Sequence, residues 1–396
     1  MESEIVYLCP FDFTSAPQCA RRVLYIGRAL SEAGFGLRYL VNHGHVRMAE
    51  GLVDWTPPQE VAFHANPEPV HSERPRGIRN LLAGLQTSRW LRRQDLTRAR
   101  AVILYCGLAG HTYHVWRACR AAKVPLVLDC AEWHREAFGA RTLFDLDYWD
   151  CQLRMRVIHP RAGNLICVSS FLANYYSRLG ARALRVPTLI DPSSRLWAVE
   201  HQLRQTEEHL RLVFSGSWHR DDLSTLLAGL GLARSRGVRA RLEFLGATHE
   251  DLETVIAPLR HAIPDLDAAV AARGRIAAED VPKCLRGASA GIVFHPRSRW
   301  ANAGFPTKVP EYLALGIPVL YYPSGDLALY IRDGIEGIAV PEYSAEGLSL
   351  AIERLATLSA AEMGAMRRAA RSRALECFDY RLYSDRLRAF MTGARS

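Results

Sequence analysis

Lysine is almost absent from this chain. Only Lys123, Lys283 and Lys308 are lysines among its 50 Lys and Arg residues, and with 41 Asp and Glu residues the formal net charge is +9. Codon usage alone can produce such an arginine excess, but a basic chain also favours an anionic partner, such as a nucleotide diphosphate or an anionic lipid. Nucleic acid is not expected, because the sequence has no zinc-finger spacing and no RNP-like aromatic pattern, and its basic residues are spread along the whole chain.

Long apolar runs and paired cysteines are also missing. No run approaches the ~20 apolar residues that span a bilayer, and the longest, Tyr312–Tyr322, is broken by Gly316 and Pro318. The nine cysteines are scattered and include no CxxC pair, which predicts free thiols in a reducing compartment and neither a disulfide framework nor a zinc site. The first residues, Met-Glu-Ser-Glu, lack the basic segment of a signal peptide. We therefore expect a cytoplasmic protein.

Short apolar runs alternate with helical patterns along most of the chain, which at 396 residues is long enough for two domains. Strands alternating with helices predict an α/β fold with parallel sheets covered on both faces. A polar stretch within 191–210 interrupts the alternation and indicates a connection between two units. The predicted strands are 4–9, 37–41, 101–106, 125–128, 164–169, 184–186, 211–215, 241–245, 290–294 and 318–322. The predicted helices are 111–122, 170–179, 221–234, 250–262, 308–315, 345–357, 361–376 and 380–391, with a further one from Pro17 towards Gly34 that Ser15 would cap.

The segment Asn302–Leu320 concentrates the residues that point to chemistry. It runs from a loop into a short helix, which Gly316 ends, and then into a strand. A helix start that carries Thr307 and Lys308 suits a phosphate, and Glu311, one turn later on the same face, suits a ribose diol. Alternatively, Lys308 and Glu311 form an exposed helix pair worth about 0.2–0.5 kcal/mol.

The sequence of this segment resembles the donor-binding signature of GT-B glycosyltransferases, particularly retaining family 4, in which Lys-x-x-Glu-Tyr-x-Ala-x-Gly-x-Pro-Val is common. The resemblance continues through Tyr330–Val340, and upstream it includes Leu212–Ser217, Arg220–Asp222 and Ser169. The resemblance extends to specific motifs over about residues 165–345. Over residues 1–160 only the general pattern is similar. The resemblance implies a GT-B fold, in which two Rossmann-like lobes with parallel sheets face a central cleft.

The resemblance also implies a division of the chain. Residues 1–195 would form an acceptor-binding lobe and 205–376 a lobe that binds the nucleotide-sugar donor. The C-terminal helix, 377–396, would return to the N-terminal lobe. Because ligands bind beyond the carboxyl ends of strands in such sheets, the loops after the strands are the expected site.

The donor contacts that the resemblance implies centre on Lys308 for the diphosphate and Glu311 for the ribose, with Arg220 as a second phosphate contact and the base near Arg273–Ile276. Family 4 usually has a first glutamate separated from the second by seven residues (E-x7-E), at the position where this chain has Ala303. Asn302, or amides around Gly304 and Phe305, would then contact the sugar. The full set of expected donor-binding residues is Gly216, Ser217, Arg275, Ile276, Asn302, Gly304, Phe305, Thr307, Lys308 and Glu311.

The acceptor side is expected at the loops of the N-terminal lobe. Glu132 and His134 follow the strand 125–128, and either could orient the acceptor hydroxyl or touch the donor sugar. Alternatively, Asp129 or Glu132 caps the next helix. Ser15 is expected to face the cleft. The catalytic residues would be Lys308, Arg220, His134 and Glu132.

No metal site is expected. His111 and His114 share a helical face, but no HExxH glutamate accompanies them. No cofactor is expected beyond the nucleotide-sugar co-substrate, whose base (UDP, GDP or dTDP) the sequence leaves open.

Residues 76–93 contain five arginines and no acid, with Ile78, Leu81, Leu82, Leu85 and Trp90 as a candidate apolar stripe. This pattern is typical of an interfacial helix that contacts anionic lipid, which suits a lipid-linked acceptor. The alternative is a surface helix packed on the first lobe.

The sequence therefore predicts a metal-independent, retaining glycosyltransferase that uses a nucleotide-diphosphate sugar and a glycan, lipid-linked or small-molecule acceptor. Two alternatives remain open. The first is a nucleotide-sugar epimerase of the same fold, and the second is a degenerate, non-catalytic partner subunit, which Ala303 would explain.

Overall fold

The computed structural model describes residues 3–13, 16–42, 62–66, 80–133, 142, 144–198, 209–216, 220–260, 263, 266–277 and 279–394. The chain divides into two compact units. The N-terminal unit comprises Met1–Leu189, Asn302–Phe305 and Tyr380–Ser396, and the C-terminal unit comprises Ile190–Ala301 and Pro306–Asp379.

The N-terminal unit is built on a seven-stranded sheet in the order β3-β2-β1-β4-β5-β6-β7, and every pairing in it is parallel. Its strands are β1 (Glu4–Cys9), β2 (Gly36–Asn42), β3 (Ala62–Asn66), β4 (Ala99–Tyr105), β5 (Leu126–Cys130), β6 (Asn164–Cys167) and β7 (Arg182–Arg185). The central strands β1, β4 and β5 are almost fully buried, as their unbroken apolar runs require.

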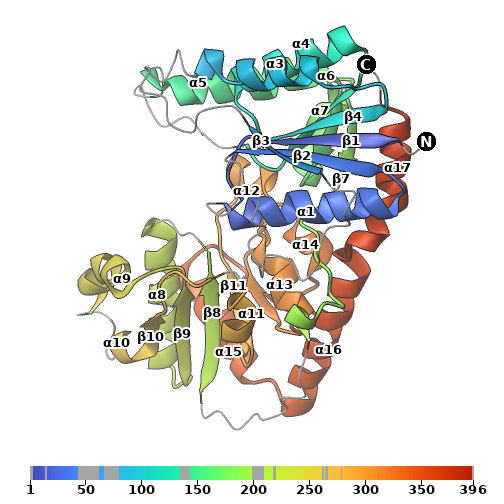
Figure 1. The fold of residues 1–396 in the computed structure, drawn as a ribbon. Helices are drawn as coiled ribbons and strands as arrows, with labels where there is room; N and C mark the ends of the chain where they lie inside the picture. Colours follow the sequence, from blue (N-terminus) through green and yellow to red (C-terminus); the bar gives the residue numbers. More distant parts are fainter. Residues whose placement is uncertain are drawn as a thin grey trace. The chain divides into compact units, whose positions relative to one another are not determined.

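Helices cover both faces of this sheet, with α1 on one face and α3 and α4 on the other (Figure 1). The C-terminal helix α17 packs on α1 within the same unit. The helices are α1 (Pro17–Glu32), α3 (Leu85–Arg93), α4 (Ala109–Ala122), α5 (Leu146–Leu153), a π-helical turn (Arg154–Ile158), α6 (His159–Ala162), α7 (Ser170–Arg178), a 3-10 turn (Tyr380–Tyr383) and α17 (Ser384–Thr392).

A buried ion pair holds the centre of the N-terminal unit together. Arg22 of α1 donates to the Asp129 carboxylate of β5 at 2.7 and 3.0 Å and to the carbonyls of Val186 and Pro187. Tyr7 of β1 donates to the other carboxylate oxygen at 2.6 Å. The prediction that Asp129 caps a helix is therefore wrong for this residue, because its carboxylate is inside the unit and joins three elements.

The C-terminal unit has a six-stranded parallel sheet in the order β10-β9-β8-β11-β12-β13. Its strands are β8 (Leu210–Ser215), β9 (Ala240–Leu245), β10 (Val270–Ala272), β11 (Ala290–Val293), β12 (Val319–Tyr321) and β13 (Gly337–Ala339). The helices are α8 (Arg220–Ser235), α9 (His249–Ile256), α10 (Leu266–Ala269), α11 (Val281–Leu285), α12 (Arg299–Ala303), α13 (Lys308–Ala314), α14 (Leu327–Tyr330), α15 (Ala345–Ala356) and α16 (Ala360–Cys377), with 3-10 turns at Arg195–Trp197 and Ala257–Leu259.

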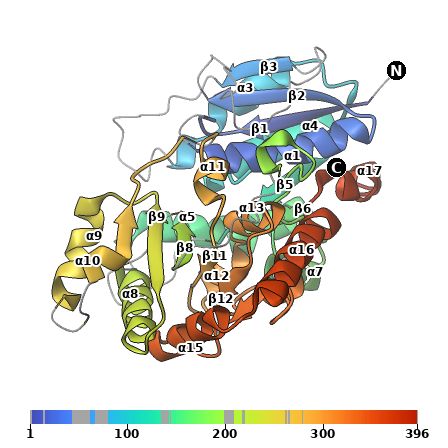
Figure 2. The ribbon, with the colours of Figure 1, turned by 90° about the horizontal axis from the view of Figure 1, so that it is seen from below.

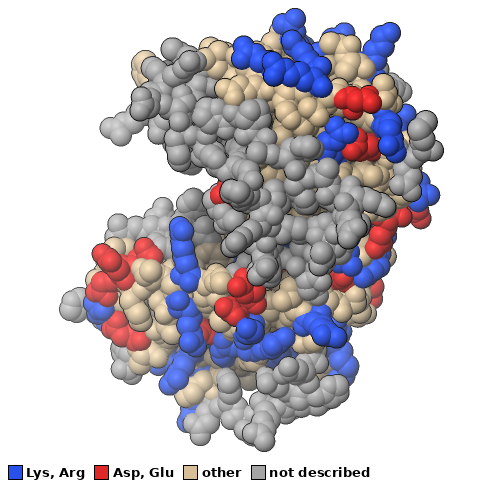
Figure 3. Space-filling model, in the orientation of Figure 1, with Lys and Arg blue, Asp and Glu red and all other residues tan. Residues whose placement is uncertain are grey.

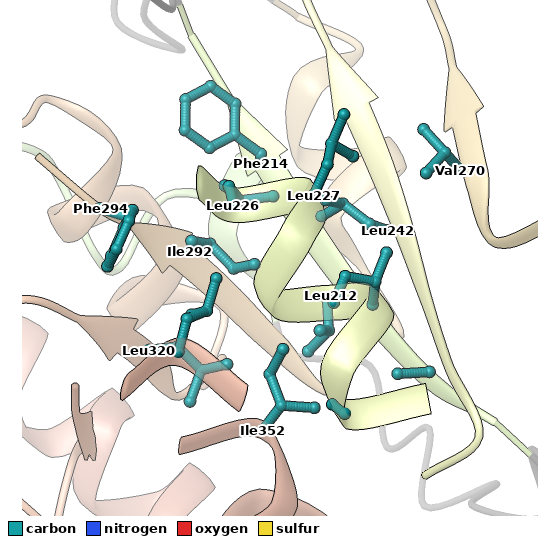
Figure 4. Packing of buried hydrophobic residues seen from close by; sticks show 14 of the residues in the cluster. Leu212, Phe214, Leu226, Leu227, Leu242, Val270, Ile292, Phe294, Leu320 and Ile352 are labelled. Carbon is teal, nitrogen blue, oxygen red and sulfur yellow. The ribbon is translucent and has the colours of Figure 1, made fainter. Parts of the chain in front are cut away.

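One apolar core fills the space between this sheet and the helices α8 and α15, which lie side by side (Figure 2). Alternate residues of the strands point into it: Leu212 and Phe214 from β8, Leu242 from β9 and Ile292 from β11 (Figure 4). The alternation of these residues follows from the pleat of a strand, in which successive side chains point to opposite faces.

The predicted fold class, two parallel Rossmann-like α/β units, is confirmed. Three strands were not predicted: β3, β10 and β13, which lie at the outer positions of the two sheets. The predicted cap of the first helix is wrong, since Ala16 occupies the N-cap position and makes no side-chain capping bond. Pro17 does begin that helix, which ends at Glu32.

All nine cysteines are free. Five of them are buried, and all five belong to the N-terminal unit: Cys9, Cys119, Cys130, Cys151 and Cys167. Cys19, Cys106, Cys284 and Cys377 are partly exposed.

Each strand order contains a topological switch point. The chain moves outward from β1 to β3 and then returns to β4 on the other side of β1, and the C-terminal unit does the same between β8 and β11. In open α/β sheets, ligands bind outside the carboxyl ends of the strands at such a point. The ends of β8 and β11 are therefore the first place to look for a ligand in the C-terminal unit.

Candidate functional site

Glycines line the carboxyl edge of the C-terminal sheet, which is the edge formed by the ends of β8, β9, β10 and β11. Gly216 follows β8, Gly246 follows β9 and Gly274 follows β10, all with positive φ. The N–H of Gly246 donates to the Gly274 carbonyl at 2.8 Å, and a Cβ on Gly246 would come within 3.2 Å of the Gly216 carbonyl oxygen. At these three positions no side chain covers the backbone, so a ligand can approach the edge of the sheet closely.

The helix α13 is fixed to the end of β8 by Tyr312. Its buried hydroxyl accepts a hydrogen bond from the N–H of Ser215 at 3.1 Å, and it lies 3.4 Å from the Val213 carbonyl. Burial raises the pKa of Tyr312 above its ordinary value. Its ring packs where Gly291 of β11 has no side chain, since a Cβ there would lie 2.5 Å from the ring. Gly316, with φ +65°, ends the helix as predicted.

Lys308 and Glu311 form an ion pair at the start of α13, with 3.0 Å between Nζ and Oε2. The Glu311 side chain is 5% exposed and that of Lys308 is 22% exposed. The alternative of an exposed helix pair is therefore wrong: the carboxylate is buried and the ammonium group is only partly open to solvent. The helix has seven residues, and Thr307, its N-cap, makes no side-chain capping bond.

A second charged network holds the segment after β10. Glu243 of β9 accepts hydrogen bonds from Arg211 of β8, at 2.9 Å from Nε, and from Arg273. Burial by itself would raise the pKa of Glu243, but these hydrogen bonds lower it below its ordinary value. The network positions the backbone that leads to the exposed Arg275 and half-buried Ile276, which are predicted to lie near the base.

A third cluster lies at the switch point of the C-terminal sheet. Asp222, in the first turn of α8, accepts a hydrogen bond from the Tyr343 hydroxyl, and its other carboxylate oxygen lies 3.7 Å from Nδ1 of His295. The Tyr343 ring stacks on Phe294 with 4.4 Å between centroids. The sequence prediction missed this cluster. The position of His295, just after a predicted strand, was an available signal, but Tyr343 comes 121 residues after Asp222 and only the fold brings it there.

The expected donor-binding residues divide between the two units. Gly216, Arg275, Ile276, Thr307, Lys308 and Glu311 belong to the C-terminal unit. Asn302, Gly304 and Phe305 are in a segment that groups with the N-terminal unit. Arg220 begins α8, but its side chain lies outside the described part of the structure, as does the whole of Ser217.

Ala303, at the position where family 4 usually has glutamate, is fully buried. Its carbonyl accepts a hydrogen bond of 2.8 Å from the Ser169 hydroxyl. Ser169 is itself buried and also accepts a bond from the N–H of Leu172, so it caps α7. A hydrogen bond to its carbonyl thus holds the backbone at Ala303 in place. Its methyl group is buried and does not face solvent.

On the expected acceptor side, Glu132 is half-buried just after β5. Ser15 and His134 lie outside the described residues. Cys106, directly after β4, has φ +37°, a backbone conformation rare for a residue with a side chain. The buried Arg154 donates to the Gly107 carbonyl beside it at 2.8 Å.

The two histidines of α4 have structural roles. His111 is buried, and burial lowers its pKa to about 4. His114 lies 3.0 Å from the Leu81 carbonyl through Nε2. Among the residues that the structure describes, no group of His, Cys, Asp and Glu is arranged to hold a metal ion.

The predicted interfacial helix over 76–93 is not a single helix. Residues 76–79 lie outside the described part, and a turn at Ala83 and Gly84 separates residues 80–82 from α3. Gly84 has φ +86°, and a Cβ there would lie 2.5 Å from the His111 backbone. Close packing against α4 therefore breaks the helix, so Leu81 and Leu82 do not share one continuous helix with Leu85 and Trp90; Ile78, the remaining member of the predicted stripe, lies outside the described residues. Leu81, at 68% exposure, is left facing solvent.

Comparisons with known proteins agree with this architecture. Residues 202–357, which is less than half of the chain, match the family described as Glycosyl transferases group 1. No curated protein matches the sequence.

Several solved structures share the fold. A glycosyltransferase from Rickettsia africae has a TM-score of 0.70 at 11% identity, with 98% of each chain covered. Sucrose-phosphate synthase from Thermosynechococcus elongatus has a TM-score of 0.69 at 14% identity, with 97% of each chain covered. Anabaena HepE, solved with UDP and glucose, has a TM-score of 0.66 at 14% identity, covering 99% of this chain and 100% of that one.

At these identities the structural likeness shows the fold, which is that of GT-B glycosyltransferases. The group 1 match over the C-terminal unit supports a glycosyltransferase. None of the described helices is long and apolar enough to cross a membrane.

Proposed function

We propose that this protein transfers a sugar from a nucleotide-diphosphate sugar, and that the carboxyl edge of the C-terminal sheet binds the donor. The observation that carries the proposal is the Lys308–Glu311 pair, held at the end of β8 by Tyr312 beside a glycine-lined edge. This arrangement lies inside the segment that matches the glycosyltransferase family. HepE, which shares the fold, has been solved with UDP-glucose.

In this proposal, Lys308 moves from Glu311 to the diphosphate, and Glu311 then accepts hydrogen bonds from the ribose. Arg220 and Gly216 with Ser217 complete the phosphate site, and Arg275 with Ile276 border the base. Asn302, Gly304, Phe305 and Thr307 are proposed to contact the sugar and the phosphate.

The chemical demand on these residues is to stabilise charge on the departing diphosphate. Protein cations supply that stabilisation in the proposal, so transfer proceeds without a metal ion and, as the family resemblance implies, with retention of configuration. Glu132 and His134 are proposed to orient the acceptor hydroxyl. The acceptor is a glycan, a lipid-linked sugar or a small molecule.

The test begins with UDP-, GDP- and dTDP-sugars, each scored by thermal shift and by donor hydrolysis. Lys308→Ala is expected to lower affinity for the preferred diphosphate at least ~10-fold, the effect of losing one charged hydrogen bond. Lys283→Ala is the matched control, because Lys283 also pairs with an acid on its own helix, at 2.8 Å from Asp280, but is 69% exposed.

If binding and hydrolysis survive Lys308→Ala unchanged, the phosphate site is wrong. An epimerised sugar formed without acceptor would identify the epimerase instead. A wild-type protein whose melting temperature no nucleotide raises would indicate the non-catalytic subunit.

We also propose that the helices α3 and α4 contact anionic lipid at the inner face of the cytoplasmic membrane. Arg and Lys side chains gather over these helices (Figure 3). Neither helix contains an acid, and the exposed cations are Arg89, Arg92 and Arg93 of α3 and Arg117 and Arg120 of α4. Basic clusters beside aromatic side chains are attracted to anionic headgroups.

Sedimentation with vesicles tests this contact. Binding is expected to phosphatidylglycerol vesicles and not to phosphatidylcholine vesicles, and to weaken when Arg89, Arg92 and Arg93 become Gln. Replacing Arg236, Arg260 and Arg354 of the C-terminal unit by Gln removes the same charge elsewhere and is expected to leave binding unchanged. Equal losses from both triple variants would show that only net charge matters.

A further inference from the structure

His295, Asp222 and Tyr343 form a cluster to which none of the donor contacts above assigns a role. It lies where β8 and β11, the two strands of the switch point, reach the carboxyl edge of the C-terminal sheet. Asp222 comes from the helix after β8, His295 from the loop after β11 and Tyr343 from the loop after β13. A helix start and two loops therefore converge at the position where α/β sheets bind ligands.

The imidazole of His295 is held on one side only. Nδ1 is buried and makes no hydrogen bond to a described residue; it lies 3.7 Å from the Asp222 carboxylate, and the ring packs edge-on against Trp300 with 5.3 Å between centroids. Nε2 makes no hydrogen bond to any residue in the described part of the chain, and it is not among the buried polar atoms that lack a partner. The His295 side chain is 18% exposed. One ring nitrogen is thus buried at ion-pair distance from an acid, and the other is available to a ligand.

Asp222 is held in turn by Tyr343. The tyrosine hydroxyl donates to one carboxylate oxygen, and the tyrosine ring is stacked on the buried Phe294. The carboxylate can therefore not rotate freely away from the imidazole. An imidazole that packs on Trp300 and has one nitrogen facing this carboxylate presents its other nitrogen in a limited range of directions.

We propose that His295 is a further donor-binding residue, which donates a hydrogen bond from Nε2 to the diphosphate of the nucleotide sugar, and that Asp222 and Tyr343 are its positioning residues. This proposal rests on the proposed function. An imidazolium donates from both nitrogens, so a ring between the Asp222 carboxylate and a phosphate satisfies both anions. In this proposal His295 and Lys308 both donate to the diphosphate that departs.

The first experiment measures binding of UDP, GDP and dTDP, and of the corresponding nucleosides, to the full chain. His295→Gln and His295→Phe are expected to weaken the preferred diphosphate about 10-fold, as for a lost charged hydrogen bond, and to leave nucleoside affinity unchanged. His209→Gln is the matched control, since His209 precedes β8 and so lies at the opposite end of that strand.

Asp222→Asn keeps an acceptor for Tyr343 but removes the charge behind the imidazole. It is expected to weaken diphosphate binding and not nucleoside binding, whereas a merely structural role would lower both together with the melting temperature. Tyr343→Phe is expected to produce a smaller loss of the same kind.

The second experiment needs no variant. Diethylpyrocarbonate modifies accessible imidazole nitrogens, and peptide mass spectrometry reports each site. The nucleoside diphosphate is expected to protect His295 from modification and to leave His209 unprotected, while the nucleoside protects neither.

The outcomes separate the two proposals. Unchanged diphosphate affinity in both His295 variants, or modification of His295 that the diphosphate does not slow, would overturn the role of His295 while Lys308→Ala still weakens binding. If the wild-type protein binds no nucleoside diphosphate, the proposed function itself fails and this inference with it.

Discussion

The hydroxyl of Tyr312 and the backbone N–H of Ser215 are joined by a hydrogen bond of 3.1 Å. Tyr312 lies one turn after Lys308 on α13, and Ser215 is the last residue of β8, directly before Gly216. This bond therefore fixes the helix that carries the proposed diphosphate contact against the glycine-lined edge. The apolar ring supports the geometry by packing on β11 at Gly291.

Tyr312→Phe is expected to lower the free energy of unfolding by about 1–3 kcal/mol, because the Ser215 N–H loses its acceptor in a buried place. Donor affinity is expected to fall as well, since Lys308 is then less firmly positioned. Urea unfolding and calorimetric titration with the preferred nucleotide measure the two effects. Tyr322→Phe, a half-buried tyrosine of the same unit, is the control and should change neither.

Asp129→Asn is expected to be strongly destabilising. Removing one partner of a buried ion pair leaves the other charge uncompensated, which costs about 3–5 kcal/mol. Here the guanidinium of Arg22 would remain inside the N-terminal unit with neutral carbonyl oxygens as partners, those of Val186, Pro187 and the new amide, and no negative charge. Chemical denaturation measures the loss, and the double variant Asp129→Leu with Arg22→Met should recover part of it. No recovery in the double variant would contradict this account.

His111 should make the protein less stable in acid. Burial lowers its pKa from 6.5 to about 4, so the unfolded chain binds a proton that the folded chain does not. The contribution of the neutral ring is full above pH 6.5 and is lost as the pH falls towards 4, by about 3 kcal/mol in total. From pH 7.5 to 4.5, the unfolding free energy of wild type should therefore fall relative to that of His111→Phe. A constant difference would contradict the prediction.

Ala303→Glu restores the residue that family 4 usually has, but it is not expected to raise activity. Ala303 is fully buried, and an unpaired carboxylate there should cost about 3 kcal/mol or more. The hydrogen bond between Ser169 and the Ala303 carbonyl would also be displaced. Ala301→Glu, at a partly exposed position of the same helix, should be tolerated. A stable Ala303→Glu protein with faster donor hydrolysis would refute this reasoning.

The sequence predicted the central strands well because each is buried on both faces and so reads as an unbroken apolar run. It did not predict β3, β10 and β13, which are outer strands, with Val270–Ala272 and Gly337–Ala339 only three residues long. Runs that short carry no periodicity. The break at Gly84 was missed for another reason, because it depends on contact with His111 in a helix that comes later in the chain.

For the site, the pattern from Thr307 to Gly316 correctly predicted the helix and the loop before it. The Lys, Glu and Gly that form this pattern lie close together along the sequence, so it can be recognised without knowledge of the fold. The burial of Glu311 and the bond from Tyr312 to Ser215 could not be predicted, because they depend on which strand lies under the helix. The same holds for Asp222 and Tyr343, whose contact joins the start of α8 to a loop more than a hundred residues later.

The distribution of thiols has a practical consequence for following how this chain unfolds. All five buried cysteines are in the N-terminal unit, whereas the cysteines of the C-terminal unit, Cys284 and Cys377, are already partly exposed. Pulsed alkylation after a jump into denaturant therefore reports the opening of the N-terminal unit alone. Tryptophan or circular-dichroism signals report both units, so any delay between the two records gives the order in which the units lose structure.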